Sequence, residues 1–479
     1  MSITNFFRNV QSKSYKTRIF GQFCRENEVI HSERTKDLNS RSEKAGEYVV
    51  YWMQQSARAH YNHALELALQ QAATLGLPLL VVFVLTDTFP EANLRHYRFL
   101  LEGLEDTRAR LADRGIQFTL LRGEPVAAVS AVAARAALLV CDRGYLRIQR
   151  QWRAALADSA PCRVTEVESD VVIPVRSAYP KEAYNAATLR RHINPQLDTF
   201  LRTPQTVEPE HQLSAPPSGE DLAALPALLG ALAVDRSVQP VTTFRGGTRE
   251  ANRRLDDFVA DALHRYDEER SDPSLNAVSH LSPYLHFGHI SPIRIALAVR
   301  DADTSQHEKD AFLEELIVRR ELAMNFCFYN PGYDSCDTAL PDWARQSLAE
   351  HQPDSRPALY DHDTLEAAQT DDPYWNAAQT EMLETGKMHN YMRMYWGKKL
   401  IEWSTTPQQA FEIALELNNK YELDGRDPNS FSGVAWCFGK HDRPWQERPV
   451  FGKIRYMNAN GLRRKFDIES YVKNCNKRN

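Results

Sequence analysis

The feature that most constrains the fold is an alternation of short β-rich apolar runs with longer amphipathic segments. The apolar runs are YVVYWM (48–53), LLVVFV (79–84), QFTLL (117–121), ALLVC (137–141) and RVTEV (163–167). Strands that alternate with helices at this spacing predict an α/β domain, a doubly wound parallel sheet covered by helices. Such sheets bind ligands at the carboxyl ends of their strands. No GxGxxG or Walker loop follows the first run, so an ordinary dinucleotide or P-loop site is not indicated.

Beyond residue 176 this alternation fades. The segment 177–245 is rich in Pro, Ser and acidic residues and predicts an interdomain linker. Residues 246–479 have helical periodicity almost throughout. Residues 1–45 are polar, without periodicity, and predict a flexible tail. Because 479 residues exceed what one hydrophobic core usually supports, we expect a tail, an α/β domain (46–176), a linker and an all-α domain (246–479).

Composition excludes several classes of protein. No apolar run is long enough to span a bilayer, and the seven cysteines contain no CxxC pair, so neither a disulfide framework nor a zinc site is indicated. HExxH and GxSxG motifs are also missing. We expect an intracellular, soluble, monomeric protein with no metal and no membrane partner. In a bacterium it would lie in the cytoplasm or nucleoid, and in a eukaryote in the nucleus or an organelle.

The charge of the chain does not decide which kind of partner it binds. The net charge of -5 argues against a general polyanion binder, but residues 440–479 contain 11 Lys and Arg against 4 Asp and Glu. Such a run is either a solvated surface or the basic rim that a nucleic acid requires. The helical half also holds six of the eight tryptophans. Aromatic residues and arginines around loops suit a large planar redox cofactor better than hydrolysis.

One predicted helix concentrates these residues. The stretch GKMHNYMRMYWGKKLIEW (386–403) contains Trp396 and Trp403, which are seven residues apart and therefore lie on nearly the same face. Trp375 precedes this helix and could fold against it. Core packing is the ordinary interpretation of such residues. A path for electrons from a pocket to the surface is the alternative.

Several long segments resemble the class II cyclobutane pyrimidine dimer photolyases, within the photolyase/cryptochrome superfamily. They are YWMQQSARAHYNHAL, SHLSPYLHFGHIS, FLEELIVRRELAMNFCFYN, WNAAQTEMLETGKMHNYMRMYWGKKLIEW, LDGRDPNSFSGVAW and ERPVFGKIRYMNANGLRRKFD. They occur in the order found in that family and cover most of the chain from residue 48. The resemblance implies a helical domain that holds FAD, and light-driven repair of cyclobutane pyrimidine dimers in DNA by electron transfer from the reduced flavin to a flipped-out dimer.

The resemblance also implies the residues around FAD. The expected cofactor contacts are Tyr266, Ser279, Leu281, Ser282, Asn390, Arg393, Asp424 and Asp427. Arg393 and Asp424 match a buried pair beside the flavin ring, where a cation would stabilise the anionic reduced flavin. Asn418 would face flavin N5, although a helix-capping Asn is an equally simple interpretation. A second, light-harvesting chromophore, a deazaflavin or a folate, is compatible with the α/β domain, but no sequence feature selects either.

The electron path and the DNA site follow from the same resemblance. Photoactivation would run through Trp396 nearest the flavin, then Trp375, then Trp403, with Tyr360 and Tyr391 as side routes. The expected contacts to the dimer and to DNA are Arg270, Glu315, Arg319, Met394, Trp436, Arg443 and Arg455, with Lys453, Arg463, Arg464 and Lys465 as phosphate contacts or plain surface. Glu315 would bond the bases, although an ordinary ion pair with Arg319 is the alternative.

Two departures from the family pattern bear on these expectations. The CFGK loop before His441 is one residue shorter than usual, which affects the placing of Arg443. Gly397 stands where Ala is expected, in mid-helix, at a cost of about 1 kcal/mol unless a neighbour needs the space. Two other functions remain in view. A cryptochrome-like light sensor would not need Glu315, Met394 and Trp436, and repair of (6-4) photoproducts would need a histidine pair over the lesion.

Overall fold

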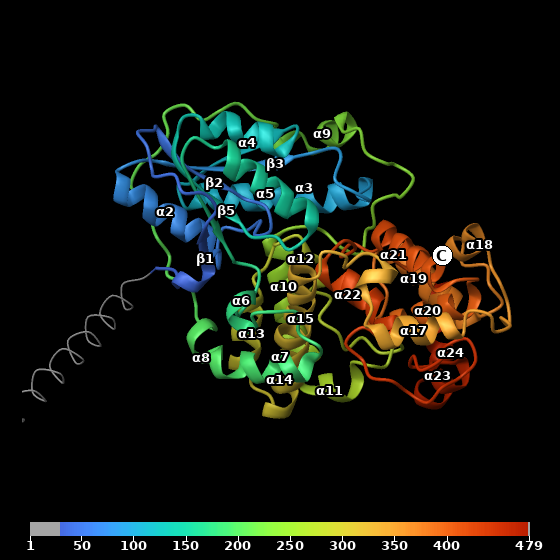
Figure 1. The fold of residues 1–479 in the computed structure, drawn as a ribbon. Coiled ribbons are helices and arrows are strands. Elements are labelled where there is room, and N and C mark those ends of the chain that lie inside the picture. Colours follow the sequence, from blue (N-terminus) through green and yellow to red (C-terminus); the bar gives the residue numbers. More distant parts are fainter. Residues whose placement is uncertain (1–28, 478–479) are drawn as a thin grey trace, which may run out of the picture.

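The computed structural model describes residues 29–477 and contains a six-stranded sheet in its N-terminal part (Figure 1). The strand order is β1-β6-β5-β2-β3-β4; β1 runs antiparallel to β6 and the other neighbours are parallel. The strands are β1 Thr35–Asp37, β2 Tyr48–Trp52, β3 Leu79–Leu85, β4 Gln117–Arg122, β5 Ala136–Asp142 and β6 Arg163–Val167. The predicted α/β fold class is confirmed.

Helices cover both faces of this sheet. They are α2 His63–Leu75, α3 Leu94–Asp113, α4 Pro125–Ala133 and α5 Arg147–Ser159. Side chains of β2 alternate between two apolar cores: Val49 and Tyr51 pack with the residues of α2 and α3, whereas Val50 and Trp52 pack with those of α4 and α5. Because both faces of β2 are buried, the strand is an uninterrupted apolar run, as parallel strands usually are.

The segment expected to be a tail is in part structured. Its residues Ser32–Arg34 form a 3₁₀ turn and Thr35–Asp37 form β1, the antiparallel edge strand. Arg34 is buried and donates hydrogen bonds to the backbone carbonyls of Glu168, Val171 and Val172. Residues 1–28 of the predicted tail lie outside the described residues.

The predicted linker also contains ordered elements. They are α6 Val175–Ala178, α7 Ala186–Ile193, η2 Asn194–Gln196, α8 Leu197–Phe200, η3 Leu222–Ala224 and α9 Leu225–Ala231. Leu189 and Phe200 join the core of the helical part, while Leu222 and Leu228 join the core of the sheet. Figure 1 accordingly shows α7 and α8 beside the helical part and α9 above α3. The segment therefore packs first on one part of the molecule and then on the other.

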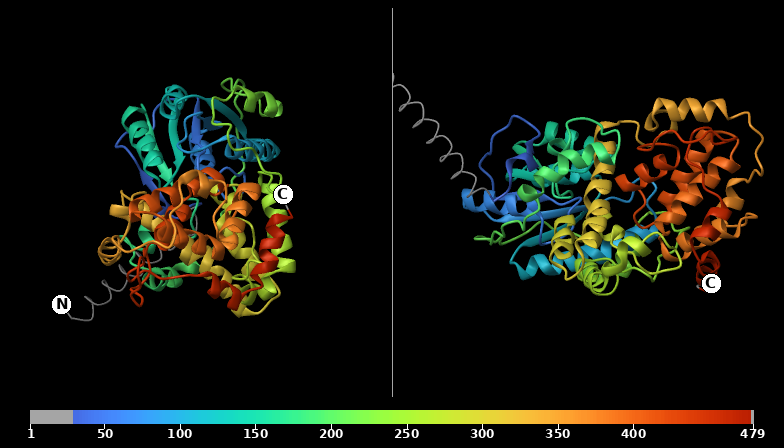
Figure 2. Two further views of the ribbon diagram at one scale, coloured as in Figure 1. Left: turned by 90° about the vertical axis from the view of Figure 1, so that its right-hand side faces the viewer. Right: turned by 90° about the horizontal axis from the view of Figure 1, so that it is seen from below.

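The C-terminal half is helical. Its elements are α10 Thr248–Asp261, η4 Leu263–Arg265, α11 Tyr266–Glu269, α12 Ser282–His286, α13 Pro292–Asp301, α14 Gln306–Leu313, the π-helical turn η5 Glu314–Arg319, α15 Arg320–Tyr329, α16 Cys336–Ala339, α17 Asp342–Glu350, α18 His362–Glu366, α19 Pro373–Thr385, α20 Asn390–Trp403, α21 Pro407–Tyr421, α22 Pro428–Cys437, α23 Ala459–Lys465 and α24 Ile468–Asn476. Figure 2 shows this half as a body beside the sheet.

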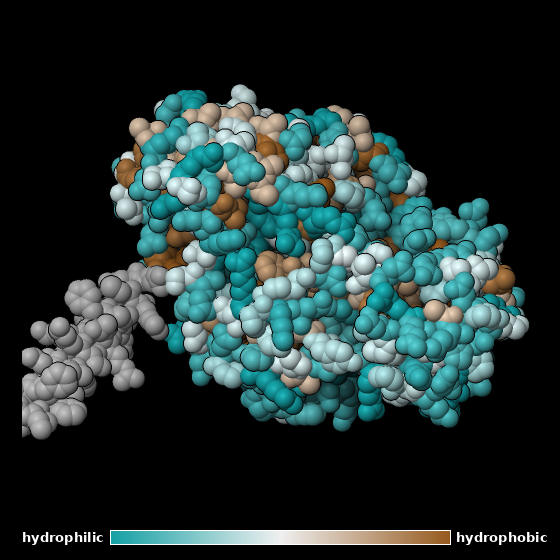
Figure 3. Space-filling model, in the orientation of Figure 1, coloured by the Kyte–Doolittle hydropathy of each residue, from teal (hydrophilic) through white to brown (hydrophobic). Residues whose placement is uncertain are grey.

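The two parts are joined by buried polar contacts. Arg95, on α3, donates to the carbonyls of Met382, Leu383 and Tyr421, which lie near the C-terminal ends of α19 and α21. Basic groups are favourable at such helix ends. The face drawn in Figure 3 is mostly hydrophilic. Among residues 29–477 no helix combines the length and the apolar character that crossing a membrane requires.

Candidate active site

A cavity of about 1200 Å³ lies in the helical half. Its volume exceeds the 300–1,000 Å³ or so of an ordinary small-molecule site. The predicted site residues that line it are Tyr266, Arg270, Ser279, Leu281, Ser282, Glu315, Arg319, Asn390, Arg393, Met394, Asp424, Asp427, Trp436 and Arg455. The predicted residues outside its lining are Trp375, Trp396, Trp403, Asn418 and Arg443. Segments more than 180 residues apart in the chain thus meet at one site.

One part of the wall can hold phosphate groups. Ser279 and Ser282 line the cavity at the start of α12. The Nζ of Lys387 donates to Ser282 Oγ at 2.6 Å and lies 3.5 Å from Asp424 Oδ2. Serine hydroxyls beside an ammonium group provide the donors and the charge that a pyrophosphate requires. The sequence interpretation missed Lys387, although it belongs to the same GKMHN motif as Asn390.

The guanidinium of Arg393 has a different partner from the one expected. Its Nη1 donates a hydrogen bond of 3.0 Å to Glu422 Oε2 rather than to Asp424. The reason is geometric: the backbone N–H of Met388 also donates to Glu422, which fixes that carboxyl beside α20. Arg393 therefore lies near two carboxyl groups. The sequence interpretation had assigned only Asp424.

These two carboxyl groups differ in proton affinity. Burial raises the pKa of Glu422 to about 8, and the charge of Arg393 opposes this rise only in part. Burial also raises the pKa of Asp424, but the charge of Lys387, a hydrogen bond with Glu422 and the charge of Arg393 outweigh it, and the net pKa lies well below its ordinary value. Asp424 therefore holds the negative charge at neutral pH, next to the cations of the cavity wall.

Asp427 and Asn390 support the same wall. Asp427 caps the N-terminus of α22 through the backbone N–H of Asn429, and its other oxygen lies 3.1 Å from His286 Nδ1. Asn390, the first residue of α20, accepts a hydrogen bond from Arg393 Nη2 at 3.3 Å. Both residues thus have local partners and also border the cavity.

Another part of the cavity wall combines the carboxylate of Glu315 with the guanidinium groups of Arg270 and Arg319. Glu315 lies in the π-helical turn and pairs with Arg270 at 2.8 Å, whereas Arg319 pairs with Glu314. The ordinary i,i+4 pair between Glu315 and Arg319 is therefore not the one formed. π-helical turns are frequent at functional sites, and this turn directs Glu315 into the cavity lining.

Two aromatic residues and two arginines form a group, called the mouth below, in which Trp436 and Arg455 line the cavity and Trp445 and Arg443 do not. The guanidinium of Arg455 lies 5.1 Å from the ring centre of Trp436 and 4.3 Å from that of Trp445. Arg443 lies over Trp445 at 5.5 Å, outside the cavity lining. Asp442 pairs with Arg455 at 3.1 Å. The sequence interpretation missed Trp445, which is 39% exposed.

The three predicted electron-transfer tryptophans are in contact in the predicted order. The rings of Trp396 and Trp375 are stacked, with centres 6.1 Å apart and planes at 8°, and Trp375 meets Trp403 edge-on at 5.6 Å. Tyr360 contacts Trp403 at 5.0 Å. Tyr391 instead packs on Phe466. The contacts extend from α20 through α19 and back to α20, and then reach the half-buried Tyr360.

Two buried oxygen atoms near this site have no hydrogen-bond partner among the described residues, and a bound ligand could supply one. Asp424 Oδ1 and Asn418 Oδ1 are buried, with no hydrogen-bond partner among the residues described. Leaving such atoms unpaired is costly. Together with Lys387, Arg393 and the serines, they fit a large cofactor with phosphates and a polar ring such as FAD. Asn418 itself lies in α21 and is not among the residues that line the cavity.

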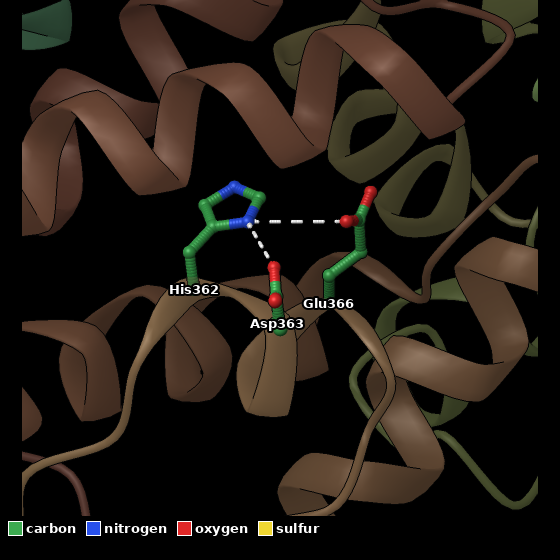
Figure 4. Close-up of side chains that lie close together, drawn as sticks. All are labelled: His362, Asp363 and Glu366. Carbon is green, nitrogen blue, oxygen red and sulfur yellow. Dashed lines mark ion pairs between the residues drawn. The ribbon is translucent and has the colours of Figure 1, made fainter.

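A separate acidic group lies outside this cavity. His362, Asp363 and Glu366 come together on α18 (Figure 4). Glu366 Oε1, however, already accepts bonds from Lys420 Nζ and Tyr421 OH. The Asp363 side chain is fully exposed. These contacts account for the group without a metal ion.

Comparison with known proteins assigns the family. Residues 49–210 match the DNA photolyase family model. A deoxyribodipyrimidine photo-lyase of Methanothermobacter thermautotrophicus is 49% identical over 93% of this chain and 98% of its own length, and one of Oryza sativa is 41% identical over 92% and 89%. A Sulfolobus tokodaii photolyase solved with two FAD molecules has a TM-score of 0.69 at 16% identity, over 89% of each chain. A Synechocystis cryptochrome has a TM-score of 0.68 at 16% identity, over 89% of this chain and 88% of its own. These two structures share the fold, and the sequence relatives show that the chain belongs to the DNA photolyase family.

Proposed function

We propose that this chain is a deoxyribodipyrimidine photo-lyase, a carbon-carbon lyase that uses FAD and light to split cyclobutane pyrimidine dimers in DNA. The observation that carries the proposal is that one cavity is lined by both sets of groups the reaction needs. Lys387, Ser282 and Arg393 suit the cofactor, and Glu315 and Trp436 suit a flipped-out dimer. The photolyase relatives, which align over almost the whole chain, support the same activity.

Reduced FAD, when bound and excited by light, supplies the electron that opens the cyclobutane ring. The protein's groups position the partners and balance charge. Arg393 places a cation at the cofactor. Glu315, held by Arg270, accepts hydrogen bonds from the pyrimidine bases and keeps them in register. Trp436 offers an aromatic wall to the flipped bases, and such stacking is worth about 1–3 kcal/mol per base. Met394 lends a polarizable apolar contact.

DNA contacts at the mouth form part of the proposal. Arg443 and Arg455, with Trp445 between them, would border the gap left when the dimer leaves the duplex. Flipping a dimer costs a few kcal/mol, less than for an intact pair, because the lesion is already poorly stacked. The basic segment 440–479 would neutralise phosphates. A cryptochrome-like sensor without repair activity is the weaker alternative, since nothing in such a function requires Glu315 and Trp436 at the same cavity.

Several finer features belong to the same proposal. They are membership of class II, a monomeric state, an intracellular location, and the division into an α/β domain (46–176), a connecting segment (177–245) and a catalytic domain (246–479). The described cysteines are buried thiols, which suits a reducing compartment. A second chromophore, a deazaflavin or a folate, would occupy the α/β part. The Trp396–Trp375–Trp403 path would serve photoactivation of the flavin.

The decisive experiment is a repair assay. Purified protein is reduced, mixed with DNA that contains cyclobutane dimers, and exposed to blue light. We expect recovery of the ultraviolet absorbance of thymine, and none in the dark. Binding of FAD without any recovery of absorbance would leave the photosensor as the better function.

A matched pair of variants locates the activity. Glu315→Ala removes the carboxylate from the cavity, and we expect repair to slow by about 10- to 100-fold, the loss of a charge-assisted hydrogen bond. Glu314→Ala is the control, because Glu314 pairs with Arg190 and Arg319 and is not part of the cavity lining. Equal rates in the two variants would contradict the assignment of Glu315.

A further inference from the structure

Asn419, the neighbour of Asn418 near the end of α21, is completely buried and hydrogen-bonded at both ends of its side-chain amide. Its Nδ2 donates to Glu91 Oε2 at 2.8 Å, and Glu91 belongs to the α/β part of the molecule. Its Oδ1 accepts from the backbone N–H of Arg426 at 2.8 Å and from Asn418 Nδ2 at 3.3 Å. Three distant segments therefore meet at one amide group.

These partners fix the orientation of both amides. A backbone N–H can only donate, so the oxygen of Asn419 must face Arg426, and its NH₂ group must face the carboxylate of Glu91. Asn418 consequently presents its own NH₂ group to the oxygen of Asn419. The oxygen of Asn418 is left as the available end. It is buried and has no hydrogen-bond partner within residues 29–477.

Two residues that are hydrogen-bonded to Asn419 have strained backbone conformations. Glu91 has a φ of 57° and Arg426 a φ of 67°, both in the left-handed region that non-glycine residues seldom adopt. Strain of this kind persists only where the surroundings over-determine it, and it clusters at functional sites. Here the two strained residues bond opposite ends of the Asn419 amide. Arg426 adds a second contact, from its Nη1 to the Asn419 carbonyl at 2.9 Å.

We propose that Asn419 is a positioning residue, held from the α/β part by Glu91, that turns the amide oxygen of Asn418 toward a hydrogen-bond donor on the cofactor. The proposal rests on the proposed function. Flavin N5 is such a donor when it is protonated and an acceptor when it is not, so a fixed amide oxygen favours the N5-protonated forms. We call this series of hydrogen bonds, from Glu91 through Asn419 to Asn418, the lock. It connects the two parts of the molecule, so the α/β part influences the protonation of the flavin.

The test uses substitutions at Glu91, which lies at the surface and can be changed without opening the core. Glu91→Met removes the acceptor and keeps an unbranched side chain of similar length. Glu91→Gln keeps an amide oxygen that can accept from Asn419 Nδ2. The control is Asn93→Ala, which leaves the contacts of Asn419 in place but removes another hydrogen bond at this interface, from Asn93 Nδ2 to the Lys420 carbonyl at 2.7 Å, together with the N-terminal cap of α3.

The readout is the visible spectrum of bound, one-electron-reduced FAD as a function of pH, which distinguishes flavin protonated at N5 from flavin that has lost this proton. In Glu91→Met we expect the proton to be lost about half to one pH unit lower than in wild type, the equivalent of one hydrogen bond. Glu91→Gln and Asn93→Ala should titrate as wild type. Asn419→Ala should reproduce the shift if Glu91→Met is too poorly folded to measure.

The outcomes separate the two proposals. An unshifted titration in both Glu91→Met and Asn419→Ala, with normal FAD content and repair, would overturn the lock alone. The same shift in Asn93→Ala as in Glu91→Met would also overturn it, because general loosening of the interface would then explain the effect. Failure of wild type to bind FAD would instead overturn the proposed function.

Discussion

Helix α20 has a closed side, where Trp396 and Trp403 pack around Trp375, and an open side, where Arg393 and Met394 line the cavity. On the closed side every ring is at most 5% exposed, and the indole N–H groups of Trp396 and Trp375 are bonded to Gln379 Oε1 and to the Trp396 carbonyl. On the open side Arg393 lies beside Glu422 and Lys387 beside Asp424, one oxygen of which has no partner among the described residues.

The contrast shows which contacts the protein completes by itself. The closed side satisfies its polar atoms internally, so its geometry is set by folding. The open side concentrates charge that a ligand must complete. A cofactor that binds only the folded state would therefore stabilise the open side by mass action. The closed side can be altered without disturbing cofactor binding, and this separation is open to test.

The largest effect is expected from Trp375→Phe on the closed side. Phenylalanine keeps an aromatic ring in the stack but is much harder to oxidise than an indole, so the path from Trp396 to Trp403 is interrupted. Light-driven reduction of oxidised FAD should be abolished, while protein reduced chemically beforehand should repair dimers at the wild-type rate. The measurements are FAD absorbance under illumination and the repair assay.

Trp343→Phe is the control for this variant, because Trp343 lies on α17, outside the stack. Slow photoreduction in both variants would point to a general loss of packing. Normal photoreduction in Trp375→Phe would mean that electrons reach the flavin by another route. Loss of repair in prereduced Trp375→Phe would contradict the separation of the two sides of α20.

The next largest effect concerns Glu422 on the open side. Its pKa is about 8 in the folded protein, against 4.5 for an ordinary glutamate side chain. The folded state therefore keeps a proton that the unfolded state loses, and stability falls as pH rises from 4.5 to 8. Glu422→Gln removes this dependence. Between pH 5 and 8 we expect the variant to gain about 2–5 kcal/mol relative to wild type, measured by thermal or denaturant unfolding at the two pH values.

Asp424 does not confuse this measurement, because its pKa is lowered and its contribution is lost only below the ordinary carboxyl range. Glu412→Gln, on the exposed face of α21, is the matched control and should follow wild type at both pH values. A constant difference in stability between Glu422→Gln and wild type from pH 5 to 8 would show that Glu422 is ionised in the folded protein.

The sequence predicted the sheet more closely than the site. Five strands were placed to within two residues because buried parallel strands are continuous apolar runs. β1 was missed, since TKD has three polar residues and its pairing with β6 is set by distant contacts. The helices α7 and α8 were missed because the Pro-rich and acidic stretch that follows them dominated the composition of residues 177–245.

Within the site, the residues carried by long motifs were gathered at the cavity, and those that depend on tertiary approach were not found. Lys387 lies within one of the family-like motifs and Glu422 directly precedes another. Neither motif indicates by its own sequence that Lys387 contacts Ser282 or that Glu422 contacts Arg393. The partner of Arg393 was misassigned for the same reason. The order of the tryptophans was an implication of the family resemblance, and helical spacing added only that Trp396 and Trp403 lie on one face of the helix.

The smallest effect tests the third side of α20, which packs on α22. A Cβ atom at Gly397 would lie 2.7 Å from Cys437 Sγ and 3.1 Å from Cys437 Cβ, so this departure from the expected alanine follows from the neighbouring side chain. Gly397→Ala gains about 1 kcal/mol of helix propensity but should lose about 1–3 kcal/mol to overpacking. We expect a net loss in unfolding free energy.

In the double variant Gly397→Ala with Cys437→Ala the overlap disappears, and a double-mutant cycle should give a favourable coupling of about 1 kcal/mol or more. Simple additivity of the two changes would mean that the thiol rotates away and that the glycine is not required for the contact between α20 and α22.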